Sequence, residues 1–96
     1  MATYIVLEKF TAQGISSIKS YRQRVEAARK IAQDAGGDLT AYLTMGEYDV
    51  VVVLSAPDDE TATRIVLNVA RRGNVTTQTL RAYTEEEAYR LVEALP

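Results

Sequence analysis

The chain contains neither cysteine nor histidine, and these two absences exclude several classes of function. Without cysteine there is no disulfide, no thiolate nucleophile and no cysteine-ligated metal. Without histidine the chain lacks the commonest general base and the usual axial ligand of haem. We therefore expect no metal or cofactor site, and any acid–base chemistry would depend on carboxyl and phenol groups.

The chain also lacks a strong net charge, a leader-like segment and a long apolar run. Its 11 basic and 13 acidic residues give a formal net charge of −2, which provides no electrostatic basis for binding nucleic acid or an acidic membrane. The first residues are strand-like, without a basic region before an apolar core, and no apolar run approaches the length of a membrane span. We expect a cytoplasmic protein that binds neither nucleic acids nor membranes.

The apolar run Val50–Leu54 is the most informative segment that the chain does contain. Four of its five residues are β-branched and none alternates with a polar residue, a pattern typical of a strand that is buried on both faces. In a chain of this length, one layer of helices can cover only one face of a small sheet. The other face is therefore expected to meet a second subunit or to enclose a pocket.

Patterns of apolar residues predict four strands and three helices: strand 3–10, helix 15–35, strand 38–45, strand 50–54, helix 58–72, strand 74–82 and helix 84–95. This order predicts one α+β domain over residues 1–96, with a ferredoxin-like sheet and both crossover helices on one face. The last helix is an addition to that core, and Thr84 and Glu87 form its capping box. Two such sheets packed face to face would form a dimeric α/β barrel.

Several short motifs resemble those of the GYD domain family: Gly46-x-Tyr48-Asp49, Ala56-Pro57-Asp58-Asp59, Gly73-Asn74-Val75 with Thr79-Leu80-Arg81-Ala82, and Thr11-x-x-Gly14. One departure is the Glu47 that separates Gly46 from Tyr48. The resemblance spans nearly the whole chain and implies a small stand-alone prokaryotic protein with the dimeric α/β-barrel fold. The turn is also similar to the ligand-binding domain of leucine-responsive regulators, in which amino acids bind between subunits, but the chain lacks their DNA-binding helix-turn-helix.

The turn formed by Gly46, Tyr48 and Asp49 permits a structural and a catalytic interpretation. In the structural one, Asp49 accepts hydrogen bonds from backbone N–H groups of the hairpin while Tyr48 packs at the sheet edge. In the catalytic one, the phenol and the carboxylate act together. Because adjacent strand residues point to opposite faces, we favour the structural interpretation.

Two sets of polar residues on the second and fourth strands are the better candidates for a binding pocket. Each set lies on one face of its strand, and hydroxyl groups with one guanidinium could bind a small carboxylate in an apolar interior. Leu80 and Ala82 would then face the helices. The alternative is that the threonines only favour strands and that Arg81 pairs with an acid such as Glu8 or Glu47. The candidates are Thr40, Tyr42, Thr44, Thr77, Thr79 and Arg81.

These observations lead to three hypotheses of function. The first is a homo-oligomeric module, not an enzyme, that binds a small anionic or amphipathic molecule at the sheet face or between subunits. The second is a metal-independent, cofactor-free enzyme of the monooxygenase or isomerase type, with Glu8, Asp49, Tyr42 or Tyr48 as its acid–base groups, each of which needs a shifted pKa. The third is a structural subunit of a larger assembly.

Overall fold

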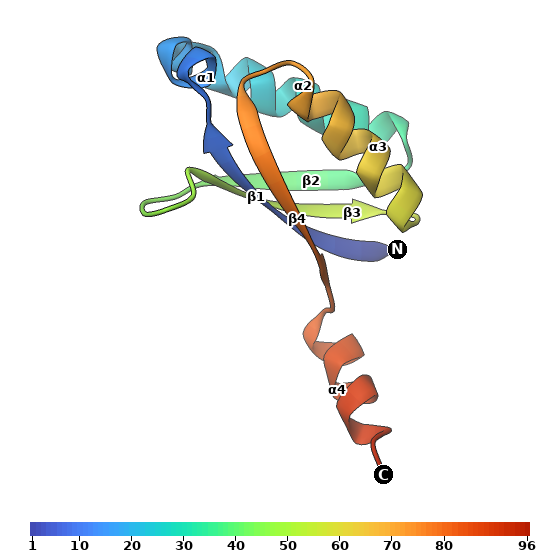
Figure 1. Cartoon of the computed structure of the whole chain (residues 1–96). Helices are drawn as coiled ribbons and strands as arrows, with labels where there is room; N and C mark the ends of the chain where they lie inside the picture. The colour runs from blue at the N-terminus through green and yellow to red at the C-terminus, as the bar shows by residue number, and fades with distance from the viewer.

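A computed structural model describes all 96 residues of the chain. Its elements are β1 (Ala2–Phe10), α1 (Ala12–Ser16), η1 (Ile18–Ser20), α2 (Tyr21–Asp34), β2 (Asp38–Leu43), β3 (Val50–Ala56), α3 (Asp59–Ala70), β4 (Val75–Ala82) and α4 (Glu85–Glu93). The four strands form one antiparallel sheet in the order β2-β3-β1-β4. Helices α2 and α3 lie together on one face of this sheet (Figure 1). The predicted ferredoxin-like α+β architecture is confirmed.

The first helical segment is the main departure from the predicted elements. The sequence pattern predicts one helix over 15–35, whereas the chain forms α1, a short 3₁₀ turn and then α2. Thr11 caps α1 by accepting a hydrogen bond from the Gly14 N–H, and the Ser17 hydroxyl donates to the Gln13 carbonyl at 2.8 Å. Serine side chains that bond to nearby backbone groups compete with helix continuation, which explains the interruption before Tyr21.

The core fills the space between the sheet and its two covering helices. In β3, Val50, Val52 and Leu54 are buried on the helix side, whereas Val51 and Val53 point to the uncovered face because successive strand residues alternate. Ala62 and Ile65 of α3 and Ala32 of α2 complete the buried cluster. The apolar run therefore supplies both faces of the sheet, and only one of them is covered within the chain.

The uncovered sheet face, which we call the open face, carries an apolar centre. Ile5 and Leu7 of β1 lie between Val51 and Val53 of β3 and Leu80 of β4, as the strand register shows. Val53 and Leu80 are 38% and 42% exposed, and Tyr42 at the β2 edge is 56% exposed. No helix covers this face.

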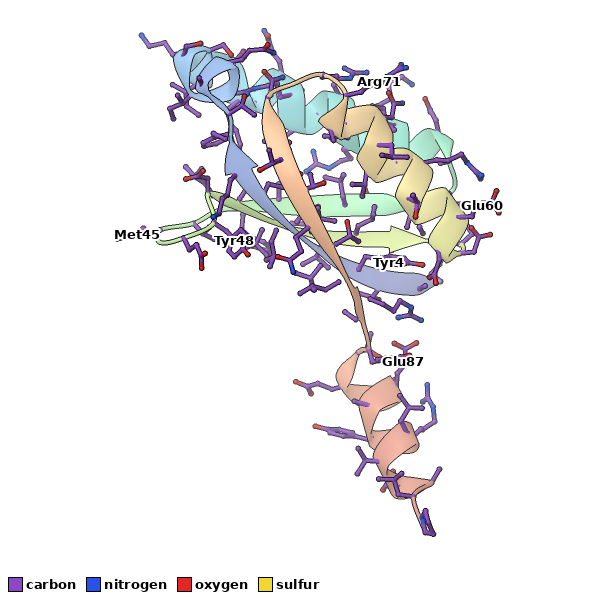
Figure 2. The ribbon with its side chains drawn as sticks, in the orientation of Figure 1. Tyr4, Met45, Tyr48, Glu60, Arg71 and Glu87 are labelled. Carbon is purple, nitrogen blue, oxygen red and sulfur yellow. The ribbon has the colours of Figure 1, made fainter.

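Helix α4 extends away from the two layers (Figure 1). Its capping box is complete: the Thr84 hydroxyl accepts from the Glu87 N–H, and the Glu87 carboxylate accepts from the Thr84 N–H. Figure 2 shows Glu87 and the other side chains of α4 standing clear of the sheet. None of the chain's helices is long and apolar enough to cross a membrane.

Candidate ligand-binding cavity

A cavity of about 300 Å³ lies between the sheet and the two helices that cover it. Most of its wall is apolar, and the side chains come from both layers of the fold. All four strands of the sheet contribute residues, and the helices contribute the inner sides of α2 and α3. Apolar residues that line it include Val6, Leu39, Val52, Ala28, Ile31 and Val66.

One end of the cavity is polar. Glu8 of β1 and Thr77 of β4 are register partners there, and Tyr21 and Arg24 reach the same end from the start of α2. The rings of Phe10 and Tyr21 meet edge to face, with centroids 6.3 Å apart. The cavity therefore combines an apolar body with a compact polar end, which is the general pattern of small-molecule sites.

Glu8 is the central group of the polar end. It belongs to the strand face that carries Tyr4 and Val6, so alternation directs its carboxyl group toward the helices. The carboxyl makes no hydrogen bond or ion pair within the chain. Burial raises its pKa from the ordinary 4.5 to about 7. At neutral pH the group is therefore divided between its charged and neutral forms, and it can accept or donate a hydrogen bond.

Tyr21 and Arg24 also present polar atoms that have no partner. The Tyr21 hydroxyl is buried without a hydrogen bond, and burial together with the charge of Glu8 raises its pKa. Arg24 donates through Nη2 to the carbonyls of Gly14 and Ser17, at 3.1 and 3.3 Å, but its buried Nε has no partner. A buried polar group without a partner is costly, on the order of 1–3 kcal/mol, so these atoms are suited to bind a ligand.

The Gly46-x-Tyr48-Asp49 turn holds the strand end that carries Glu8. The Asp49 carboxylate accepts a hydrogen bond from the Phe10 N–H at 2.8 Å, and the Asp49 N–H donates to the Glu8 carbonyl at 2.9 Å. Asp49 thus accepts a backbone hydrogen bond, as the structural interpretation predicts, although the donor lies on β1 and not in the hairpin. Tyr48 donates to Gln78 at 3.0 Å, so its hydroxyl and the Asp49 carboxylate serve different partners.

A second contact joins the segment that follows β1 to the segment that precedes β4. The Thr11 hydroxyl donates to the Gly73 carbonyl at 2.6 Å, and the Thr11 N–H donates to the Asn74 carbonyl at 3.0 Å. A Cβ atom at Gly14 would lie 2.0 Å from the Asn74 carbonyl oxygen. The two motif segments around Thr11 and Gly73 therefore pack directly against each other, and Asn74 lines the cavity.

The structure does not bring the predicted ligand-binding residues together. Thr40 and Tyr42 pair with Val53 and Val51 and lie on the open face. Thr77, Thr79 and Arg81 pair with Glu8, Val6 and Tyr4 and lie on the helix side. The prediction that the two sets share one face is therefore wrong, and so is the expectation that Leu80 faces the helices. The cause is the register of β4, which strand alternation alone cannot determine.

Only Thr77 of the six predicted residues lines the cavity. Thr44 lies in the turn, where its hydroxyl donates to the Tyr48 carbonyl at 2.7 Å. Thr79 is exposed. The sequence pattern predicts that each set follows one face of its strand. It does not determine whether the two sets lie on the same side of the sheet.

Arg81 is committed to contacts within the chain. Its Nε lies 3.9 Å from a carboxylate oxygen of Asp59, and its guanidinium lies over the rings of Tyr4 and Tyr83, at 5.5 and 4.7 Å. The alternative of an internal ion pair is correct in kind, but the acid is Asp59 instead of Glu8 or Glu47. Asp59 also accepts a hydrogen bond from the Tyr4 hydroxyl at 2.5 Å.

Sequence patterns alone do not identify Tyr21 and Arg24 as cavity residues. Tyr21 fits the apolar stripe of the predicted first helix, and Arg24 resembles one of that helix's many solvated basic residues. The sequence feature that could indicate the site is Glu8, because this carboxylate lies on the same strand face as the apolar residues Tyr4 and Val6. No group of three or more acidic side chains lies close enough to hold a metal ion.

Comparison with known proteins gives a family and a fold. The family model described as GYD domain matches residues 4–92. The chain is 37% identical over 84 residues to a Thermus thermophilus protein named "Glutamine synthetase and cystathionine beta-lyase binding protein", with 85% of this chain and 88% of that protein covered.

Two solved structures of designed proteins share the fold. Ferredog-Diesel has a TM-score of 0.54 at 10% identity, and the match covers 84% of this chain and 85% of that one. Foldit4 has a TM-score of 0.56 at 12% identity, and the match covers 88% and 97%. At these identities the likeness concerns the fold alone.

Proposed function

The chain belongs to the GYD domain family, and we propose that it is a homo-oligomeric binding module that holds a small amphipathic molecule between its sheet and its helices. The observation that carries this proposal is the cavity of about 300 Å³, whose polar end contains three groups without partners. An apolar wall with a few convergent polar groups is what a small-molecule site requires.

The unpartnered atoms indicate which head group the ligand carries. Glu8 offers carboxyl oxygens, whereas the Tyr21 hydroxyl and Arg24 Nε offer hydrogen-bond donors. A primary carboxamide is a neutral group that supplies donors to the first and a carbonyl acceptor to the others. A carboxylate head would meet the charge of Glu8 above pH 7. We therefore propose an amphipathic ligand with an amide-like head and not an anionic one.

The open face supports the oligomer. Its apolar centre, with Val53 and Leu80 more than one-third exposed, is the kind of surface that proteins cover with a partner. We propose that two copies pack their open faces together as a dimeric α/β barrel. The cavities lie on the outer, helix-covered side of each sheet in this arrangement, so each copy keeps its own site.

A matched set of probes tests the proposed ligand class. Benzamide, benzoate, benzylamine and toluene share one apolar body and differ in the head group. We expect benzamide to shift the backbone NMR signals of cavity residues such as Ala28 and Val66, and to bind at pH 8 about tenfold or more tighter than benzoate or toluene. Benzamide without any effect on cavity residues would contradict the proposal.

The contribution of Glu8 can be separated from the apolar cavity. Glu8→Leu should reduce the preference for benzamide over toluene by about tenfold, because a hydrogen bond to a charged group contributes on the order of 1.5–3 kcal/mol. Glu47→Leu is the matched control, since Glu47 is exposed and lies 3.7 Å from Lys9 at the turn. Equal effects of the two substitutions would show that the head group is held elsewhere.

A second candidate function is docking to a metabolic enzyme. The relative that is 37% identical is named for binding glutamine synthetase and cystathionine beta-lyase. We propose that this chain binds a counterpart of one of these enzymes, which is compatible with a ligand in the cavity. Size-exclusion chromatography of the chain with each purified enzyme should show a complex with at least one. Separate elution from both would contradict this proposal and leave the cavity unaffected.

A further inference from the structure

The cavity contains an acid–base group that the chain itself does not neutralise. The titratable side chains that line it are Glu8, Tyr21, Arg24 and Arg72, and Glu8 forms an ion pair with neither arginine. A guanidinium at salt-bridge distance would hold the carboxyl in its charged form and lower its pKa. Without one, burial raises the pKa of Glu8 to about 7, which suits a general base that works near neutral pH.

The base and two hydrogen-bond donors converge around Phe10. Glu8 and Phe10 are two residues apart on β1 and therefore share its helix-side face. The Arg24 guanidinium lies 5.8 Å from the centre of the Phe10 ring, and the Tyr21 ring meets the same ring at a centroid distance of 6.3 Å. All four side chains line the cavity, so one small molecule at this end can contact the base and both donors.

The two donors are suited to hold a negatively charged oxygen. Burial raises the pKa of the Tyr21 phenol, the charge of Glu8 raises it further, and the charge of Arg24 lowers it. The hydroxyl therefore stays protonated at neutral pH and can donate. This hydroxyl and the Nε of Arg24 are both buried without a partner. Preorganised donors in a site with little water stabilise the charge that develops on a substrate oxygen during a reaction.

The amide head proposed for the ligand has a carbon counterpart. A carboxamide would place an N–H group at Glu8 and its carbonyl oxygen at Tyr21 and Arg24. A ketone has the same shape, with an α C–H group in place of the N–H group. Glu8 then faces a carbon-bound proton, and the donors face the oxygen that becomes negative when this proton leaves. The arrangement that would bind an amide would therefore also promote the enolisation of a ketone.

We propose that the cavity catalyses the keto–enol tautomerisation of a small apolar 1,3-dicarbonyl compound, with Glu8 as the base and Tyr21 and Arg24 as donors to the enolate oxygen. This inference rests on the ligand site of the proposed function and adds a reaction to it. Two carbonyl groups are required because they make the C–H group between them acidic enough for a carboxylate to remove.

The reaction moves one proton and consumes no co-reactant. The Glu8 carboxylate takes a proton from the carbon between the two carbonyl groups, and the electron pair of that C–H bond forms a C=C bond. The adjacent C=O bond becomes C–O⁻, and its charge is held by the donors of Tyr21 and Arg24. The Glu8 carboxyl then gives the same proton to this oxygen, which forms the enol and restores the carboxylate. The reverse direction uses the same groups in the opposite order.

Benzoylacetone, which shares the phenyl body of benzamide, tests this inference. Its enol absorbs strongly in the near ultraviolet, so its approach to the keto–enol equilibrium in water can be followed optically. We expect the native chain to have a kcat/KM about 100-fold or more above that of Glu8→Gln. Glu47→Gln, at the exposed turn, is the matched control and should keep the native activity. Equal rates for the native chain and Glu8→Gln would overturn the inference.

The pH profile and Tyr21→Phe separate this mechanism from catalysis by surface groups. Because Glu8 must be ionised and its pKa is about 7, kcat/KM should rise with pH up to about 7 and become constant above it. A profile that is flat from pH 5 to pH 8 would indicate an exposed carboxylate and overturn the inference. Tyr21→Phe keeps the ring and removes one donor, so it should lower kcat by at least about tenfold.

Benzamide distinguishes failure of this inference from failure of the proposed function. It should inhibit the reaction competitively, with an inhibition constant equal to its dissociation constant from the NMR titration. If benzamide binds in the cavity but does not inhibit, the reaction occurs elsewhere, and the inference fails while the binding module stands. If benzamide does not bind and benzoylacetone is not turned over, both proposals fail.

Discussion

The two faces of the sheet are built from adjacent residues, but one face packs under the helices and the other is uncovered. On the helix side, Val50, Val52 and Leu54 are nearly completely buried and adjoin the cavity. On the open face, Val51 and Val53 have the same chemistry but no covering layer in one protomer. Residue type therefore does not distinguish a core position from a position on the open face in this strand. The strand register and the placement of the helices determine which valine is buried.

Replacing one valine by lysine on each face of β3 should have the largest and most different effects. Val52→Lys places a charge in the core without a partner and should destabilise the fold by about 4 kcal/mol or more. Val51→Lys should leave the chain folded and abolish the proposed dimer. Urea denaturation and sedimentation separate the two outcomes. If Val51→Lys also unfolds the protomer, the open face contributes to folding as well as assembly.

The stability of the fold should depend on pH through Glu8, a carboxyl on the helix side whose pKa is raised by burial. Its pKa is about 7 in the folded chain against 4.5 as the ordinary value, so the folded chain holds the proton more tightly. The contribution of Glu8 to stability is therefore complete below pH 4.5 and is lost as the pH rises to about 7. The change amounts to about 3 kcal/mol.

Glu8→Gln should remove this pH dependence and stabilise the chain at pH 8 by up to about 3 kcal/mol. Glu47→Gln, at the exposed turn, serves as the control and should leave the dependence unchanged. Denaturant titrations at pH 5, 6, 7 and 8 provide the measurement. An unchanged slope in Glu8→Gln would show that the carboxyl is solvated and that the polar end of the cavity is open to water.

The smallest expected difference concerns the caps of the last two helices. Asp58 caps α3 by accepting a hydrogen bond from the Thr61 N–H at 2.8 Å, and Thr84 caps α4 in the same way. Replacing either by Ala costs about 1 kcal/mol of helix stability. Asp58→Ala should lower the global unfolding free energy by that amount. Thr84→Ala should instead reduce helicity in α4 and leave the global unfolding free energy nearly unchanged.

Amide hydrogen exchange is the measurement that resolves this difference. Asp58→Ala should accelerate exchange across the whole core, whereas Thr84→Ala should accelerate it in α4 alone. Equal acceleration in the core would show that α4 is part of the protomer's cooperative fold.

Much of the fold follows from the sequence because its signals are local. Gly73 and the capping residues mark helix ends, and alternation identifies the strands. The broken first helix was missed because serine hydroxyls, not apolar spacing, decide where it stops. The candidate site depended on the register between β1 and β4, which a distant pairing determines. Arg81 illustrates the consequence, since its partner Asp59 comes from a helix end that no strand pattern could indicate.

Gly14 is a residue with no side chain and no chemistry, yet its position allows almost no substitution. The Asn74 carbonyl oxygen occupies the place where a Cβ atom would stand, 2.0 Å away. That oxygen also accepts the Thr11 N–H, so it cannot retreat without breaking the junction. Even alanine would have to push back the backbone that leads into β4 and Thr77. The tolerance of this protein to mutation therefore depends in part on the distance between two backbone segments, at Gly14 and at Asn74. A survey of side-chain contacts alone would not identify this position as sensitive.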